Sequence, residues 1–258
     1  MAIIEFEGIQ NARDLGGIPV YGGKTVAPGL FIRCGSLDKP TESDIQKIRG
    51  DLHVATIIDV RTGWERAAKL DVEIDGIENL HIPFFDKKIV GIEYEKPVEG
   101  TKKVGNDFAC DPSDFYQAMA NPLTAVFMGK GLKVTFDNAL QGRTTLIHCS
   151  GGKDRAGVFS LLLLSVLGAN REDILEDYLL TNVSREANIK PIYERFLRLT
   201  GDEELARKVT DDHKAKPSNL ENFYASVDRK FGGMDTFIAN QLGISDEDRE
   251  LLRAACTR

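Results

Sequence analysis

The chain has 258 residues, of which 42% are hydrophobic and 28% are charged, and its formal net charge is −7. This is the composition of an ordinary globular protein, and it excludes a disordered or fibrous chain. The acidic balance gives no overall positive field for nucleic acid or an anionic membrane, so any bound phosphate has to be held by local geometry.

The first residues, MAIIEFE, lack the basic region and the apolar stretch of a signal peptide. No run along the chain approaches the roughly 18 apolar residues that span a bilayer. Four cysteines without a C-x-x-C pair are too sparse for a disulfide scaffold, so reduced thiols are expected. We therefore expect a cytoplasmic protein, with export by another route left open.

Short apolar stretches predict the strands of a sheet. They are residues 29–34 (GLFIRC), 54–60 (VATIIDV), 79–83 and 144–149 (TTLIHC). The second and the last are almost continuously apolar or β-branched, which is typical of strands that are covered on both faces of a mostly parallel sheet.

Helical patterns lie between and after these strands. Residues 41–50 open with TESD, a capping box, and residues 157–167 are apolar nearly all round, as in a buried helix. From Asn170 onward the chain reads as successive helices, and SDED at residues 245–248 repeats the capping pattern. Strands that alternate with helices, followed by a helical C-terminal third, predict one α/β domain over residues 1–258.

The segment HCSGGKDRAG, residues 148–157, carries the chemistry. Cys149 closes a strand, two glycines follow, and a buried helix begins at Arg155, so backbone N–H groups and a helix N-terminus point at one anion site. Gly151 and Gly152 allow the tight backbone turn, and Arg155 offers a planar fork to two phosphate oxygens. Cys149 faces the same positive potential and is expected to react as a thiolate nucleophile. The predicted phosphate-binding residues are Ser150, Gly151, Gly152, Lys153, Asp154 and Arg155.

Three other interpretations suit this loop less well. A nucleotide-binding Walker loop fails at both ends, where Ile147 and Asp154 replace the required Gly and Ser or Thr. A non-catalytic phosphate-binding module leaves the intact nucleophile unexplained. A redox or arsenate-reducing thiol enzyme needs a resolving cysteine near Cys149, for which Cys34 is the remaining candidate.

The leaving oxygen of a phosphate ester needs a proton, and hence a general acid. Asp154 inside the loop is the first candidate, and Asp59 at the end of a neighbouring strand is the second. Asp86 is the third, at the start of a polar stretch over residues 86–105 that has no clear period. His148 is interpreted as a structural group that orients the loop rather than as a base.

The segment resembles the signature H-C-x-x-G-K-D-R-[TS]-G of the atypical bacterial tyrosine phosphatases, the family of the mycobacterial protein tyrosine phosphatase B and listerial lipid phosphatase type. Further matches to that family occur in order along almost the whole chain: NARDLGG at 11–17, FIRCGSL at 31–37, IDVRTGWE at 58–65, DYLLTN at 177–182, and FGG with LGI near the end.

The resemblance implies a central, mostly parallel sheet flanked by helices, with no metal and no organic cofactor. It implies catalytic roles for Cys149, Arg155, Asp154 and Lys153, with Asp154 now preferred to Asp59 as the acid. The expected activity is hydrolysis of phosphotyrosine, and also of phosphoserine, phosphothreonine and phosphoinositides, through a phosphocysteine intermediate. The loop lysine is associated with phosphoinositides. The expected partners are these substrates alone, bound by a monomer without nucleic acid or stable membrane insertion.

Two positions depart from the family pattern. Ala156 replaces a hydroxyl residue that commonly bonds the thiolate, so we expect a less reactive thiol unless Ser150 substitutes for it. Ala12 replaces an aromatic residue in the opening motif, which alters a wall of the site.

Overall fold

The computed structural model describes residues 2–84 and 112–258. Within them a six-stranded sheet has the order β1-β2-β5-β8-β6-β7, and its last four strands are mutually parallel. The strands are β1 (Ala2–Ile3), β2 (Arg13–Asp14), β5 (Phe31–Cys34), β8 (Thr144–His148), β6 (Val54–Asp59) and β7 (Glu78–His81), and a small separate sheet pairs β3 (Pro19–Val20) with β4 (Lys24–Thr25). The predicted mostly parallel sheet is therefore confirmed, with β8 between β5 and β6.

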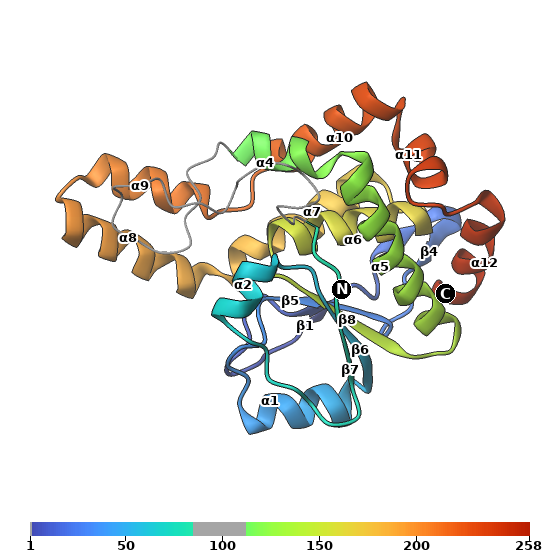
Figure 1. Ribbon diagram of the computed structural model, residues 1–258, viewed down its shortest axis with the longest axis horizontal. Coiled ribbons are helices and arrows are strands. Elements are labelled where there is room, and N and C mark those ends of the chain that lie inside the picture. The colour runs from blue at the N-terminus through green and yellow to red at the C-terminus, as the bar shows by residue number, and fades with distance from the viewer. Residues whose placement is uncertain (1, 85–111) are drawn as a thin grey trace.

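Helices cover both faces of this sheet. Figure 1 shows α5, α6 and α7 on one face and α1 on the other, while α8 and α9 project as a hairpin. The helices are α1 (Glu42–Gln46), continued by the π-helical turn Lys47–Asp51, then α2 (Gly63–Ala68), α4 (Pro112–Met119), α5 (Pro122–Leu140), α6 (Asp154–Leu167), α7 (Arg171–Ser184), α8 (Glu186–Thr200), α9 (Glu203–Asp212), α10 (Pro217–Phe231), α11 (Met234–Asn240) and α12 (Asp246–Cys256).

The capping signals mark real helix starts. Thr41 and Asp44 form a reciprocal capping box at α1, and Ser245 and Asp248 form another at α12. Asn170 accepts a hydrogen bond from a first-turn N–H of α7, as expected. These local bonds satisfy N–H groups that a helix leaves without internal partners, which is why short sequence patterns located them correctly.

The apolar character of β8 follows from its central place in the sheet. Leu146 packs into one core beside Ile32 and Ile57, and Ile147 packs into the larger core on the opposite face with Phe159 of α6. Helix α6 is buried along almost its whole length, as its sequence predicts. Burial on every side fixes the end of β8 and the start of α6, the two points between which the predicted phosphate loop is held.

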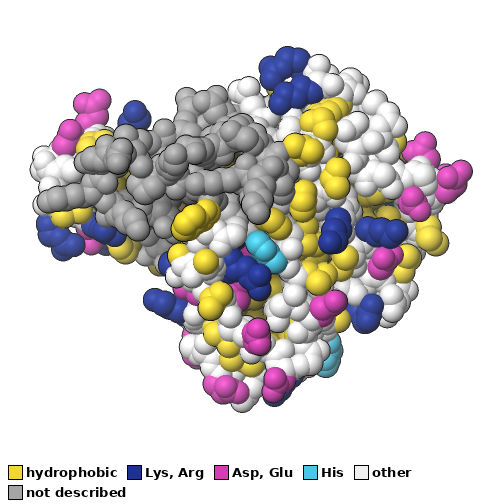
Figure 2. Space-filling view, viewed as in Figure 1, with side chains coloured by type: hydrophobic (Ala, Val, Ile, Leu, Met, Phe, Trp, Pro, Cys, Tyr) yellow, Lys and Arg dark blue, Asp and Glu magenta, His cyan; other side chains and the backbone are white. Residues whose placement is uncertain are grey.

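Charge is dispersed over the described part of the face drawn in Figure 2. The coloured part of the face seen in Figure 2 carries acidic and basic side chains side by side, without a large field of one sign. None of the helices within residues 2–84 and 112–258 is both long and apolar enough to span a bilayer.

Candidate active site

The predicted phosphate loop connects the central strand to the buried helix. Strand β8 ends at His148 and α6 begins at Asp154. Gly152 has a φ of 64°, and a Cβ at this position would lie 2.6 Å from the backbone carbonyl of Cys34. Both the left-handed backbone and the close approach require glycine, so the conformational role expected of this residue is confirmed.

The carbonyl groups of the loop are held from outside. Arg33 donates from Nη2 to the carbonyls of Gly152 at 2.8 Å and Lys153 at 3.2 Å. Asn11 donates to the carbonyl of Gly151 at 3.0 Å. These bonds satisfy three carbonyl groups of the loop and hold its backbone in place.

A buried ion-pair network fixes Arg33 in this position. Asp177 of α7 accepts from Arg33 Nη1 at 2.6 Å and from Arg13 Nε at 2.7 Å, and all three side chains are buried. Burial alone would raise the pKa of Asp177, but the two arginines hold that pKa below its ordinary value. Asp177 is therefore ionised at neutral pH, and it links β2, β5 and α7 beneath the phosphate loop.

Glu65 of α2 orients the arginine of the loop. Arg155 donates to both oxygens of Glu65, with Nη2 at 2.6 Å from Oε1. Glu65 is itself held by a capping box with Thr62, whose backbone N–H lies 3.0 Å from Oε2. Burial would raise the pKa of Glu65, but the charge of Arg155 outweighs it and holds the pKa well below the ordinary value. The guanidinium is thereby fixed in one plane.

The same carboxylate engages the hydroxyl of Ser150, which donates to Glu65 Oε1 at 2.5 Å. A hydroxyl has one proton to donate, so in this arrangement Ser150 does not donate to the thiol of Cys149. Ser150 therefore does not replace the hydroxyl group that is missing at Ala156, and it stabilises the Glu65–Arg155 pair instead.

The ammonium group of Lys153 is held by other groups of the protein. Its Nζ lies 3.0 Å from the carbonyl of Asp212, 3.3 Å from that of Lys214 and 3.4 Å from Oδ1 of Asp154. The two carbonyl contacts are hydrogen bonds, the contact with Asp154 is an ion pair, and the side chain of Lys153 is 8% exposed. Lys153 therefore ties the loop to the segment after α9.

Asp154 is the first residue of α6, where the helix dipole favours a carboxylate. The hydroxyl of Tyr116 donates to its Oδ1 at 2.5 Å, and the side chain keeps 32% of its surface exposed. Burial would raise the pKa of Asp154, but the charge of Lys153 and the hydrogen bond from Tyr116 hold it below the ordinary value. The arrangement presents a partly accessible carboxylate beside the loop.

Asp59 has a different environment. Both of its oxygens accept from Arg61, at 2.9 Å from Nε and 2.8 Å from Nη2, and the residue is 4% exposed. Asp71 accepts from the same guanidinium at 2.5 Å, and His148 Nε2 lies 3.3 Å from Asp71 Oδ2. Asp59, Asp71 and His148 bring ligand atoms within 4.8 Å of one another, as a metal site would. Here, however, the guanidinium of Arg61 supplies the positive charge between the two carboxylates. Asp86, the third candidate acid, lies outside the described residues.

Arg185 is a basic residue of the site that the sequence did not single out. It lies between α7 and α8, 9% exposed, and its guanidinium lies 3.3 Å from the position that a Cβ of Gly151 would take. Its one side-chain hydrogen bond within the described residues goes to the carbonyl of His213 at 3.4 Å, and its buried Nε has none. Among the described residues no carboxylate lies within ion-pair distance of Arg185, although its charge contributes to the lowered pKa of Asp154.

Three further residues at the loop escaped the sequence analysis, each for its own reason. Glu65 has a visible signal, because T-x-x-E at residues 62–65 is a capping box, but that signal says nothing about Arg155. Tyr116 carries no local signal. Arg33 lies in the family-matching segment 31–37, which does not reveal its contact with the loop, since both residues reach the loop from α4 and β5 across the tertiary fold.

The chain belongs to the tyrosine phosphatase family, whose model matches residues 4–258. The family resemblance inferred from the sequence is thus confirmed, and the chain is a phosphatase.

Curated relatives agree with this assignment. The chain is 24% identical over 242 residues, 93% of its length and 84% of the relative's, to a protein of Cupriavidus necator named as a tyrosine-protein phosphatase. It is 27% identical over 239 residues to the triple specificity protein phosphatase PtpB of Mycobacterium tuberculosis, covering 85% of this chain and 83% of that one. Among solved structures, the core catalytic domain of the PP-IP phosphatase Siw14 of S. cerevisiae aligns with a TM-score of 0.36 and 15% identity, covering 70% of this chain and 78% of that one.

Proposed function

We propose that this phosphatase hydrolyses phosphate monoesters through a phosphocysteine intermediate on Cys149. The observation that carries the proposal is the loop between β8 and α6, in which Arg155 is held in one plane by Glu65 next to the cysteine. A phosphate in the loop would accept hydrogen bonds from the backbone N–H groups and from the guanidinium N–H groups of Arg155 that are not bonded to Glu65. The fixed orientation of this guanidinium suits the planar oxygens of a transferring phosphoryl group.

The reaction then proceeds in two steps. The Sγ of Cys149 attacks phosphorus, the ester P–O bond breaks, and the leaving oxygen takes a proton from Asp154. Water then attacks the phosphocysteine while Asp154 takes back a proton, which releases inorganic phosphate and restores the thiolate.

Asp154 suits the general-acid role better than Asp59. Both oxygens of Asp59 accept from Arg61, and its side chain is buried with that partner. Asp154 keeps part of its surface exposed and has one oxygen without a hydrogen bond among the described residues. The dianionic charge of a bound phosphate raises the pKa of a neighbouring carboxyl, so substrate binding favours the protonated acid.

For the substrate we propose phosphotyrosine in proteins, with phosphoserine, phosphothreonine and phosphoinositides as further candidates. The M. tuberculosis relative is named for triple specificity, which supports a test of all three classes. Binding of a second phosphate needs a second cation that is not already engaged. Lys153 is engaged by two backbone carbonyls and by Asp154. Arg185 is better placed, because it lies against Gly151 and has no acidic partner among the described residues.

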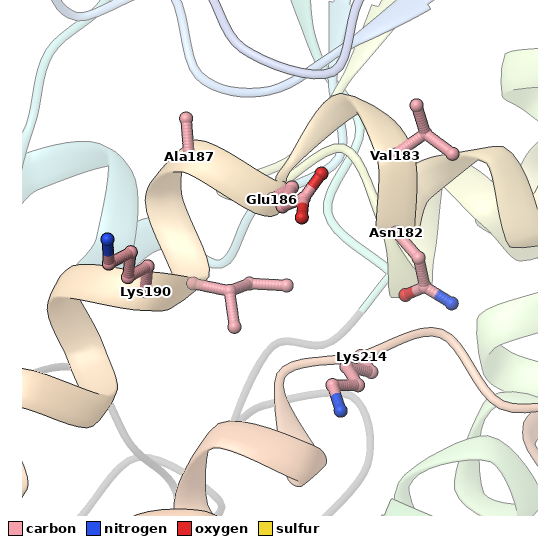
Figure 3. A pocket seen from close by; sticks show the side chains of 7 residues that line it. Asn182, Val183, Glu186, Ala187, Lys190 and Lys214 are labelled. Carbon is pink, nitrogen blue, oxygen red and sulfur yellow. The ribbon is translucent and has the colours of Figure 1, made fainter.

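Two lysines line a hollow beside the turn between α7 and α8. The hollow, of about 810 Å³, is lined by residues of α7 and α8, including Lys190, and by Lys214 from the segment after α9. Figure 3 shows Lys214 across the hollow from this turn, with Glu186 on the turn itself. The lining of this hollow carries two lysines and one glutamate, and Lys214 also forms an ion pair with Asp211 at 3.4 Å.

The decisive experiment is hydrolysis of para-nitrophenyl phosphate by wild type and Cys149→Ser, in EDTA with a reductant. We expect turnover that survives EDTA and disappears in the variant, while the variant still binds vanadate. Turnover in Cys149→Ser would refute the nucleophile. An inactive wild-type enzyme that binds phosphate would instead favour the non-catalytic module.

The specificity proposal has its own test in Arg185→Gln. We expect a small change with para-nitrophenyl phosphate and about a tenfold loss of kcat/KM for substrates with a second phosphate, the value of one charge-assisted hydrogen bond. Arg229→Gln, at an exposed arginine in the last turn of α10, is the matched control for loss of one positive charge. Equal losses for both substrate types would mean that Arg185 supports the loop and does not read a second phosphate.

The redox alternative gains no support from the geometry. Cys34 is fully buried, and burial raises the pKa of its thiol well above the ordinary value. A thiol that stays protonated attacks a neighbouring sulfur slowly.

A further inference from the structure

Three side chains from three helices form a hydrogen-bonded chain that ends on Asp154. Tyr116 of α4 donates to Asp154 Oδ1 at 2.5 Å, and its hydroxyl lies 2.6 Å from that of Tyr178 of α7. Asn219 of α10 donates from Nδ2 to the hydroxyl of Tyr178 at 2.8 Å. Tyr116 and Tyr178 are each 1% exposed, so water does not compete for these bonds.

The donors and acceptors give this chain one direction. The amide nitrogen of Asn219 can only donate, so Tyr178 receives that bond and has its own proton to give. Tyr178 donates this proton to the hydroxyl oxygen of Tyr116, and Tyr116 donates its own single proton to Asp154. An ionised carboxylate can only accept, so Oδ1 of Asp154 accepts from Tyr116, and Oδ2 is left as the oxygen that takes up a proton.

We propose that Tyr116, supported by Tyr178 and Asn219, is a positioning residue that fixes the general acid and assigns proton transfer to Asp154 Oδ2. The inference rests on the proposed acid role of Asp154. It adds that a chain of neutral side chains selects the oxygen that reacts and, together with the surrounding cations, lowers the pKa of the acid.

The hydrogen bond from Tyr116 lowers the pKa of Asp154 separately from the charged groups around it. Lys153 and Arg155 lie on either side of it in the loop, and Arg185 approaches from the turn between α7 and α8. All three are cations and stabilise the ionised carboxylate through space, but the only hydrogen bond to its side chain within the described residues comes from Tyr116. Removing that hydroxyl should raise the pKa of Asp154 while the surrounding charges stay unchanged.

The test is the pH dependence of kcat/KM for Tyr116→Phe, with aryl phosphates of good and poor leaving groups. Turnover needs protonated Asp154, so the rate falls as pH rises through the pKa of this acid. The variant should shift this falling limb upward by about one pH unit, the value of one hydrogen bond to a charged group. It should also lose about tenfold in rate with the poor leaving group, because the acid is no longer held in place.

Tyr178→Phe tests the relay without touching Asp154 directly, and it should give a smaller shift in the same direction. Tyr193→Phe, a tyrosine of α8 whose hydroxyl bonds Glu203 at the surface, is the control and should match wild type. A uniform loss of rate at every pH, with both limbs unmoved in Tyr116→Phe and Tyr178→Phe, would reduce the tyrosines to core packing and overturn the inference.

Asp154→Asn separates failure of the inference from failure of the proposed function. If this variant keeps the falling limb, Asp154 is not the acid, and the proposed acid role and the inference both fail. If Asp154→Asn abolishes the limb and Tyr116→Phe leaves it in place, only the inference fails. When the inference holds, adding Tyr116→Phe to Asp154→Asn changes neither the pH profile nor the dependence on the leaving group.

Discussion

Replacing Glu65 by Gln tests whether the fixed plane of Arg155 contributes to catalysis. The variant keeps the size of the side chain and its ability to cap α2, but it presents an amide NH₂ to one nitrogen of the guanidinium. One of the two bonds from Arg155 is then lost, and the other no longer joins opposite charges. A hydrogen bond to a charged group is worth about 1.5–3 kcal/mol, which corresponds to roughly a ten- to hundredfold fall in kcat/KM.

The assay is steady-state hydrolysis of para-nitrophenyl phosphate, together with thermal unfolding. Glu203→Gln is a suitable control, since it removes a carboxylate from an exposed Glu–Arg pair in the first turn of α9. We expect the control to match wild type and Glu65→Gln to lose mainly kcat, because a misoriented fork still attracts the substrate. If Glu65→Gln kept wild-type kinetics while folding normally, the argument that Glu65 prepares Arg155 would be refuted.

Two predictions concern stability. Gly152→Ala should lose more stability and activity than Gly201→Ala, measured by urea unfolding and turnover. Both glycines have a left-handed φ, 64° and 68°, but only Gly152 has backbone atoms in contact with the position of a new Cβ. Equal losses in the two variants would exclude this clash. Asp177→Asn should lower the free energy of unfolding by about 3–5 kcal/mol, because two buried arginines lose their partner. The exposed Asp228→Asn should change it by less than about 0.5 kcal/mol. Since the folded-state pKa of Asp177 lies below its unfolded value of about 3.9, its stabilisation is present above that pH and is lost as pH falls through the folded pKa. A wild-type acid unfolding profile that Asp177→Asn leaves unchanged would contradict this account.

Much of the fold was predictable from the sequence because helix starts are marked by local residue patterns. The capping boxes at residues 41–44 and 245–248 need only four consecutive residues, and both start helices in the structure. The predicted ends of the strands and helices were less accurate. Strand β5 is two residues shorter at its start than the predicted 29–34, and α6 begins at Asp154, three residues before the apolar run at 157–167. Hydrophobicity reports burial, whereas an element ends where its backbone hydrogen bonds end.

The loop itself was also predictable from local sequence. Gly152 has to be glycine because of its own backbone conformation, and Cys149 and Arg155 flank it within one short segment. What each charged neighbour does was not predictable. The sequence suggested a second-phosphate role for Lys153 and offered Asp59 as a second acid, and both side chains are engaged by partners from elsewhere in the fold.

The sequence by itself determined the class of this protein, a phosphatase with a cysteine and an arginine at the two ends of a glycine-containing loop, because that loop is one continuous piece of chain. Only the tertiary structure decided which residues support it. Glu65, Arg33 and Tyr116 reach the loop from α2, β5 and α4, between 38 and 119 residues away along the chain. A hydrogen bond or an ion pair depends on distance in space, and sequence patterns report only what lies within a few residues.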